Sequence, residues 1–395
     1  MKKLLLLPLA LLALFAAYIF GTFQARDVVS APPAEWTGGS EAAQAWREIA
    51  VSFEAAGAKV YAATTDARER EDGLRYLTQL LSAAIEMKVS KGDRARPAFT
   101  DWMGDDRKIL GDSPDAVYHT AEISGDHIYE VTGTREMAEY FGMMIYGRAV
   151  NGWNKVGANI NSETMTFDAQ GRFRVQIGGT EPSDGGDWLP LTSDSHMVMV
   201  RQYFHNRADK TEARFTIRNV NTLPPAPPSD TVLAARLREA TAFFNGSLDG
   251  TLALSEMLIE TPNSNSPPKR YNADFGGIFY PTDDNQYLGT WFAVEAGEAL
   301  MIEGTAPNVD YWSVSLQNRW LQSLDYENYQ VSLDNRKITL DENGRYRIVV
   351  SAQKPDSGDW LDTAGYNSGL IAIRYQLAGD VPPPTMTLVK VGELE

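Results

Sequence analysis

The chain has 395 residues, a formal net charge of −16, and hydrophobic and charged fractions of 43% and 22%. These fractions are those of a folded globular protein, and the length accommodates two domains that each bury a core. The acidic balance argues against a nucleic-acid partner, which needs clustered Lys and Arg, and the lack of cysteine excludes disulfides, thiolate nucleophiles and thiolate metal ligands.

Residues 1–25 read as a targeting segment. Lys2 and Lys3 precede an apolar run from Leu4 to Phe20, which is close to the ~20 residues that span a bilayer. No well-formed small-x-small cleavage site follows it. We expect an uncleaved signal anchor that places the rest of the chain outside the cytoplasm, with a cleaved signal peptide as the alternative. Residues 26–39 would then form a stalk.

Two helices are predicted next, as a helical hairpin. Ser40 is a good N-cap for an amphipathic helix that reaches about Ala63, and Thr65 or Asp66 caps the second helix. The apolar face expected for the second helix consists of Leu74, Leu77, Leu81, Ala84 and Ile85.

From residue 118 to about 221 the pattern changes to short β-rich runs separated by Gly, Asp and Asn, which indicates strands. The Pro-rich residues 223–228 predict a linker. Beyond the linker, residues 229–244 and 251–259 predict two further helices, and a second β-rich region runs from 279 to about 391. The expected domains are therefore residues 40–222 and 229–395.

The two β-rich regions repeat one another. Three landmarks recur at a common offset of 173 residues, namely Tyr118, Gly171 and Arg201, matched by Trp291, Gly344 and Arg374. A period of this length is that of a duplicated domain and not of a short-repeat array. The predicted fold is α+β and mainly β: two tandem jelly-roll-like antiparallel β-sandwich domains, each preceded by amphipathic helices.

The densest group of aromatic and polar side chains lies between Tyr311 and Tyr329. Flat rings next to amides and charged groups suit a small organic or glycan-like ligand. The candidate binding residues are Trp312, Gln317, Asn318, Arg319, Trp320, Asp325, Tyr326 and Arg374. Period two offers another interpretation for part of this segment, because Trp312, Val314 and Leu316 share one strand face and are expected to pack in a core.

Asp187-Trp188-Leu189 and Asp359-Trp360-Leu361 occupy matching places in the two copies. Each lies shortly before the strand that carries Arg201 or Arg374, and a buried Arg needs a carboxylate or carbonyl partner, so Asp187 and Asp359 are the expected partners. Features shared by both copies are expected to maintain the fold. If the protein is an enzyme, carboxylate acid/base pairs would carry the reaction, with Asp325, Asp359, Asp362 and Tyr366 as candidates.

Metal and cofactor signatures are missing from the sequence. The four histidines, at 119, 127, 196 and 205, have no metal-ligand spacing, and the Asp-rich segments at 112–115 and 283–285 are expected to be turns. The sequence has no phosphate-binding, dinucleotide-binding or G-x-S-x-G motif. We expect no metal and no cofactor.

The second copy resembles a bacterial family, domain of unknown function 1214. The resemblance rests on residues 311–320, on Gly344-Arg345-Tyr346-Arg347-Ile348, on residues 359–365 and on Ile373-Arg374. The stretch from the first helix through Tyr203 looks like the N-terminal half of exported or anchored members. The resemblance implies a jelly-roll fold, shared with a companion family numbered 1254, and no agreed reaction. Many relatives read Gly-His where this chain has Gly365-Tyr366.

Three functional classes remain open from the sequence. The first is an envelope protein, anchored in the inner membrane and facing the periplasm or periplasmic if cleaved, that binds a small organic or glycan-like ligand in its second β-domain. The alternatives are a cofactor-independent hydrolase or lyase, and a structural component that forms homo-oligomers through the faces of its sheets.

Overall fold

The computed structural model describes residues 39–149, 154–221, 227, 229–263, 269–270, 279–379 and 381–394. The predicted signal anchor, nearly all of the stalk and most of the linker at 223–228 lie outside these residues. Within them, no helix is both long enough and apolar enough to cross a membrane.

Three α-helices occur in the described part of the chain, and each begins close to its expected start. They are α2 (Glu41–Ala63), α3 (Ala67–Ala84) and α4 (Asp230–Ile259), with a π-helical turn at Ile85–Ser90 and a 3₁₀ turn at Val391–Glu393. Side chains of Ser40, Asp66 and Ser229 accept hydrogen bonds from backbone N–H groups in the first turn of α2, α3 and α4, respectively.

The two helices expected after the linker are in fact one helix, α4. It continues through Gly246, which is exposed, and Gly250, which is buried. Thr251 hydrogen-bonds to Tyr76 of α3 (Oγ1 to Oη 2.8 Å), and Ser255 donates to the carbonyl oxygen of Arg319 (2.6 Å). Thr251 and Ser255 therefore lie where α4 contacts α3 and the second β-domain, and the helix continues through them.

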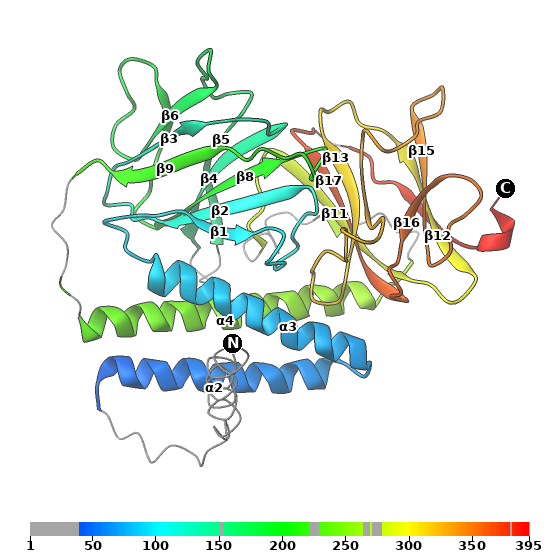
Figure 1. Ribbon diagram of the computed structural model, residues 1–395, viewed down its shortest axis with the longest axis horizontal. Coiled ribbons are helices and arrows are strands. Elements are labelled where there is room, and N and C mark those ends of the chain that lie inside the picture. The colour runs from blue at the N-terminus through cyan, green and yellow to red at the C-terminus, as the bar shows by residue number, and fades with distance from the viewer. Residues whose placement is uncertain are drawn as a thin grey trace, which may run out of the picture.

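The helices form one layer beneath two β-domains. Helix α4 runs under both domains, α3 crosses α4, and α2 packs on α4 (Figure 1). Four of the five residues on the expected apolar face lie in or against the core, namely Leu77, Leu81, Ala84 and Ile85. Leu74 is 40% exposed instead, and the buried face also takes in Gly73, Tyr76 and Leu80. Packing against the second β-domain, and not apolar spacing alone, selects that face.

Each β-domain has nine strands among the described residues, in two sheets. The first domain has β1 (Thr100–Met103), β2 (Ala116–Glu122), β3 (Tyr129–Thr134), β4 (Tyr140–Arg148), β5 (Asn154–Asn161), β6 (Arg172–Ile177), β7 (Asp187–Leu189), β8 (Ser195–Tyr203) and β9 (Arg214–Asn219). The second has β10 (Lys269–Arg270), β11 (Asn285–Ala293), β12 (Glu298–Thr305), β13 (Trp312–Gln317), β14 (Ser332–Asp334), β15 (Arg345–Ser351), β16 (Asp359–Asp362), β17 (Ser368–Gln376) and β18 (Thr385–Lys390).

The strand order is the same in the two domains. The sheets run β1-β2-β8-β4-β5 and β7-β6-β3-β9 in the first domain, and β10-β11-β17-β13-β14 and β16-β15-β12-β18 in the second. The duplication read from the sequence is thus present in the topology. The mainly β, α+β class is confirmed, but the sheets are not wholly antiparallel, since β6 pairs with β7 and β15 with β16 in parallel.

Within each domain the two sheets enclose a hydrophobic core. In the first domain Phe141 and Val198 of one sheet pack with Val131 and Phe173 of the other. In the second domain Trp312, Val314 and Leu316 all point into the equivalent core, as the period-two pattern predicts. These contacts make each domain a two-layer sandwich.

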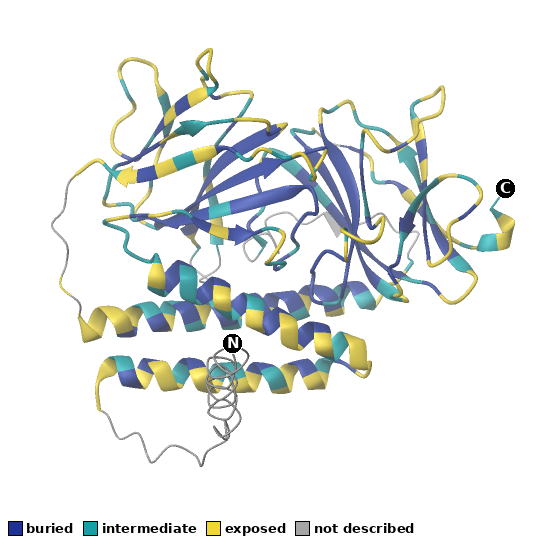
Figure 2. Cartoon of the chain, viewed as in Figure 1, coloured by how far each residue is buried: buried dark blue, intermediate teal, exposed yellow. Residues whose placement is uncertain are grey.

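In each domain the central strands of one sheet are buried on both faces (Figure 2). Strand β8 is buried at all nine positions and β4 at eight of nine, and their sequences read as nearly continuous apolar runs. The face away from the core of the first domain packs on the helices and on the second domain, where the ring centroids of Tyr203 and Tyr311 lie 5.1 Å apart. The two domains therefore meet through their doubly buried sheets.

The interface between the domains contains a reciprocal pair of hydrogen bonds. Tyr140 of β4 donates to Asp284, just before β11 (3.0 Å), and Tyr311, just before β13, donates to Asp115, just before β2 (2.7 Å). Strands β4 and β13 hold the same place in their sheets, as do β2 and β11. The contact thus has the self-complementary character of a two-fold dimer within one chain.

A buried histidine gives the fold a specific pH dependence. His196 of β8 lies with Nδ1 2.9 Å from the carbonyl oxygen of Tyr146, to which it donates. Burial, followed by the nearby cations Lys88, Arg148 and Arg94, lowers the pKa of His196 to about 2. Below pH ~6.5 His196 is protonated in the unfolded chain but stays neutral in the folded protein. The free energy of unfolding therefore falls by about 1.4 kcal/mol for each pH unit below this value.

The variant His196→Asn keeps a donor for the same carbonyl oxygen and cannot take up a proton. We expect its stability deficit relative to the wild type to shrink by about 2 kcal/mol between pH 6.5 and pH 5. Urea unfolding of both proteins across this range measures the difference. Asp112 and Asp115, whose pKa values are raised, are present in both proteins. Their contribution to the pH dependence of stability is therefore the same in both and does not affect the difference. Parallel stability profiles for the two proteins would contradict the assignment.

Candidate functional site

Two arginines at matching positions face the contact between the domains. Arg201 of β8 and Arg374 of β17 lie one residue from the core-facing positions Val200 and Ile373, so strand alternation turns both toward the interface. Their exposed fractions are 4% and 5%. Both guanidinium groups therefore carry full charge inside the protein, since arginine does not lose its proton there.

Neutral oxygen atoms accept every hydrogen bond that the two arginines make within the described residues. Arg201 donates through Nη2 to the hydroxyl of Tyr146 (2.7 Å) and to the carbonyl of Tyr280. Arg374 donates to Ser315 Oγ (3.0 Å) and to the carbonyl oxygens of Gly111 (2.7 Å) and Asp112 (3.1 Å). No carboxylate of a described residue is hydrogen-bonded to either guanidinium.

These contacts correct the expected partners of the arginines. Asp187 accepts hydrogen bonds from the backbone N–H (2.9 Å) and hydroxyl of Thr166, and Asp359 makes the same pair of bonds with Thr339. The prediction failed because short sequence distance to an arginine strand does not give spatial proximity. Both aspartates brace a loop at the other sheet of their domain.

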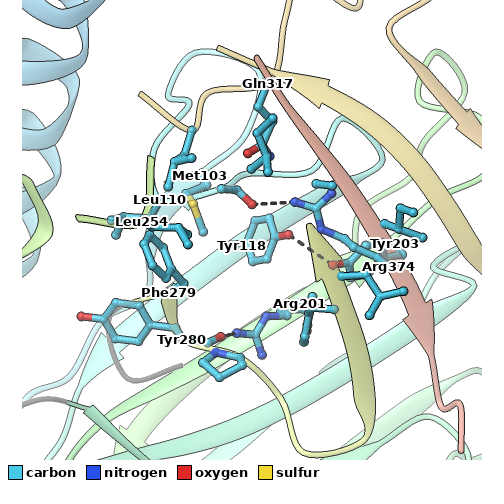
Figure 3. Close-up of a pocket in the computed structure, with 18 residues that line it drawn as sticks. Met103, Leu110, Tyr118, Arg201, Tyr203, Leu254, Phe279, Tyr280, Gln317 and Arg374 are labelled. Atoms are coloured by element: carbon cyan, nitrogen blue, oxygen red, sulfur yellow. Dashed lines mark hydrogen bonds between the residues drawn. The ribbon is translucent and has the colours of Figure 1, made fainter. Parts of the chain in front are cut away.

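A pocket lies between the two arginines (Figure 3). The ring of Tyr118 stands in this space, with its centroid 5.8 Å from the guanidinium carbon of Arg201 and its hydroxyl 3.3 Å from that of Tyr203. Much of the remaining wall is apolar and comes from both domains and α4: Met103, Leu110, Leu254, Phe279, Leu321 and Leu370. The space open to water-sized molecules is about 80 Å³. One water needs roughly 10–15 Å³ by this measure, so a small organic molecule fits.

A third cation and an acid lie behind the pocket. Asp112 accepts hydrogen bonds from the backbone and hydroxyl of Ser323, and its burial raises its pKa despite the nearby charges of Lys108 and Arg374. Burial in turn lowers the pKa of Lys108, whose Nζ donates to the carbonyl oxygens of Ser323 and Leu324. Because burial favours the neutral form of Asp112, this group balances Arg374 only in part.

The sequence of the two β-domains matches a family over both copies. Residues 118–206 and 280–377 each match the family described as "Protein of unknown function (DUF1214)". The chain carries two DUF1214 domains. No functionally curated protein matches the chain.

Two solved structures of bacterial proteins match much of the chain. An uncharacterised protein from Burkholderia cenocepacia is 25% identical, covers 89% of this chain and 98% of its own, and superimposes with a TM-score of 0.82. The VPA0106 protein from Vibrio parahaemolyticus is 13% identical and covers 80% and 97%, with a TM-score of 0.46. The likeness to the Burkholderia protein extends beyond the DUF1214 domains to most of the chain.

Two of the predicted binding residues, Gln317 and Arg374, line the pocket from the second DUF1214 domain. Trp312 lies instead in the core of that domain, 4.9 Å from Tyr346 between ring centroids. Trp320 is fully buried against α3, with its ring stacked on Tyr76. Neither tryptophan lines the pocket.

The other predicted binding residues hold the turn that follows β13. Asn318 is buried and accepts hydrogen bonds from the backbone of Trp320 and Gln322, and Arg319 is half-buried. Asp325 is exposed, and hydrogen bonds from Asn328 hold its pKa below the ordinary value. The ring of Tyr326 lies against Lys108 and Arg207 at distances of 3.9 and 4.5 Å.

The four catalytic candidates have separate hydrogen-bond partners. Asp325 caps its own turn, Asp359 is bound to Thr339, and Asp362 accepts from the backbone N–H of Ala364 (2.8 Å). Tyr366 donates to Asp72 of α3 (2.6 Å) and lies under Arg68, and burial raises its pKa to about 12. Among the described residues no hydrogen bond joins any two of the four.

The contribution of the first DUF1214 domain to the pocket was not predicted from the sequence. Arg201, Tyr118 and Tyr203 were landmarks of the repeat and were assigned to the scaffold because both copies share such features. One signal was present, namely a single Arg in an otherwise apolar strand, in Met-Val-Met-Val-Arg201 and in Leu-Ile-Ala-Ile-Arg374. A charge at a doubly buried position needs a compensating partner, and here the local sequence supplies none.

Proposed function

We propose that the protein binds a small organic anion with an apolar body in the pocket between its two DUF1214 domains. The observation that carries this proposal is the pair of buried guanidinium groups, Arg201 and Arg374, whose direct partners in the described residues are neutral. Burying a charge is costly unless it is paired. A carboxylate or similar anion would supply charge-assisted hydrogen bonds, which are stronger than neutral ones.

Backbone strain around the pocket supports the proposal. Seven non-glycine residues in the described part of the chain have φ between 50° and 56°, and three of them, Leu110, Tyr280 and Leu321, line the pocket. Such conformations cost on the order of 1–3 kcal/mol each and cluster at ligand sites, where the surrounding structure holds them. The backbone N–H of Gly111 donates to the carbonyl of Leu321 (2.9 Å) and joins two of these loops.

The proposal moves the ligand from the second domain to the contact between domains. Gln317 and Arg374 remain part of the site, and Arg201 and Tyr118 join it from the first domain. Two cations beside a largely apolar wall favour an anionic head group on a hydrophobic body over a neutral sugar, whose many hydroxyls would lose water without finding partners there.

Calorimetric titration of the full chain with 3-phenylpropionate and with its uncharged amide tests the proposal. The two compounds have nearly the same shape, so a difference in affinity reports the charge. We expect the carboxylate to bind roughly 10- to 100-fold more tightly than the amide, because hydrogen bonds to a charged group contribute about 1.5–3 kcal/mol. Equal binding of both compounds, or binding of neither, would overturn the proposal.

Variants locate the binding. Arg201→Met is expected to abolish the preference for the carboxylate, and Arg201→Lys, which keeps the charge but not the planar donors, to reduce it. Arg214→Met is the matched control, because the side chain of Arg214 is 81% exposed on β9 and pairs only with Glu136. Thermal unfolding of each variant verifies that it is folded. Unchanged affinity in a folded Arg201→Met protein would place any binding elsewhere.

A further inference from the structure

The two polar ends of the pocket differ in what they offer a ligand. At one end, Gln317 has no exposed surface, and its Nε2 donates to the carbonyl oxygen of Asp112 (2.8 Å). Since a carbonyl can only accept, this bond fixes which end of the amide is nitrogen. The other amide atom, Oε1, is a buried acceptor that has no partner among the described residues. It faces Gly111, where an added Cβ would lie 4.0 Å away.

The arginine at the Gln317 end is already well supplied with acceptors. Arg374 donates to three oxygens, from Ser315, Gly111 and Asp112, and Asp112 adds nearby negative charge. Arg201, at the other end, makes all its hydrogen bonds to described residues through Nη2, which leaves the donors on Nε and Nη1. An anionic group of a ligand would therefore bind best at Arg201, and a hydrogen-bond donor of the ligand would bind at Gln317.

Building on the proposed function, we infer that the ligand is a monocarboxylic acid with an apolar aryl or short alkyl body and a hydroxyl group at its far end. The carboxylate pairs with Arg201, the body lies along Tyr118 and the leucine-rich wall, and the hydroxyl donates to Oε1 of Gln317. A buried acceptor without a partner costs about 1–3 kcal/mol, so a ligand that satisfies it is selected over one that does not.

Three matched probes test the inference with the wild-type full chain: 3-phenylpropionate, 3-(4-hydroxyphenyl)propionate and 3-(4-methoxyphenyl)propionate. The hydroxyl can donate to Gln317, whereas the methoxy group has the same oxygen and no proton to donate. We expect the hydroxylated acid to bind about three- to tenfold more tightly than the unsubstituted acid in calorimetric titration, and the methoxy acid to lose this gain. Equal affinities for the hydroxyl and methoxy acids would overturn the inference.

The variant Gln317→Met removes the acceptor and keeps a side chain of similar length. It should bring the affinities of the hydroxylated and unsubstituted acids within about twofold of each other while the unsubstituted acid still binds. Gln44→Met, at an exposed position of α2, is the control and should keep the wild-type ratio. A wild-type ratio in Gln317→Met would overturn the assignment of the hydroxyl to Gln317.

The outcomes separate this inference from the proposal on which it rests. If none of the three acids binds, the proposed function fails and the inference fails with it. If all three bind with equal affinity and Arg201→Met abolishes binding, the pocket binds anions as proposed and only the hydroxyl preference is wrong. If Gln317→Met does not fold, the comparison of hydroxyl with methoxy in the wild-type protein still decides the question.

Discussion

Replacing Glu122 with glutamine is expected to lower the free energy of unfolding by about 3–5 kcal/mol. Glu122 ends β2, and its carboxylate lies 2.5 Å from Nζ of Lys88 in the π-helical turn; the two side chains are 2% and 3% exposed. Arg94 also reaches the carboxylate, at 3.2 Å. The neutral amide would leave Lys88 as a buried cation whose only described ion-pair partner is gone, and breaking a buried pair from one side is costly.

Urea unfolding monitored by fluorescence measures this loss. Glu130→Gln is the matched control, because Glu130 also bridges two cations, Arg174 and Arg218, but both arginines are more than 60% exposed. We expect that control to lose about 1 kcal/mol or less. The double variant Lys88→Met with Glu122→Gln should recover much of the loss, since no unpaired lysine remains. A Glu122→Gln protein as stable as the control would show that water reaches Lys88.

Replacing Trp320 with alanine is expected to cost about 3–5 kcal/mol of stability. The side chain has no exposed surface, its ring stacks on Tyr76 with 6.1 Å between centroids, and its Nε1 donates to the carbonyl oxygen of Glu69 (2.7 Å). The ring fits directly over Gly73, where an added Cβ would lie 2.5 Å from it. Trp320 thereby fastens the second DUF1214 domain to helix α3, and alanine would leave a cavity at this contact.

Thermal and urea unfolding of Trp320→Ala check the expectation, with Trp46→Ala as the control because Trp46 is 56% exposed on α2. The control should change stability by no more than about 0.5 kcal/mol. If Trp320→Ala lost little stability but bound the ligand more weakly, Trp320 would be a binding residue, as the sequence predicted. A large loss of stability with retained binding in the folded protein fits the structure.

The sequence predicted where helices begin better than it predicted which helix residues are buried. Helix starts depend on contacts between neighbouring residues, whereas burial depends on the elements that pack on the helix. Ser40, Asp66 and Ser229 marked helix starts because their side-chain oxygens satisfy backbone N–H groups within one turn, a contact that neighbouring residues decide. On the expected face of α3, Leu74 alone was misplaced: it continues the apolar spacing but is 40% exposed, whereas the small residue Gly73 is buried against Trp320. Strand β1 lies before the region in which strands were expected.

The candidate site was predicted in part. Gln317 and Arg374 were among the expected binding residues, and both line the pocket. Gln317 lies on the strand face away from Trp312, because neighbouring side chains of a strand point to opposite faces. Arg201 was recognised only as a landmark of the repeat. The assumption that shared features serve the scaffold failed to consider that two matching residues can meet across the contact between the copies.

The sequence by itself determined the duplication, the mainly β class, the helix starts and the side of each strand that meets the core. These follow from spacing and from contacts between near neighbours, which the chain carries locally. Tertiary structure decided that Arg201 and Arg374 share one pocket. Alternation states which strand face a residue occupies, whereas the element that covers this face is chosen by the packing of sheets and helices that are distant in sequence. For this reason the sequence did not predict that Arg201 and Arg374 lie close together, or that neutral oxygen atoms accept their hydrogen bonds.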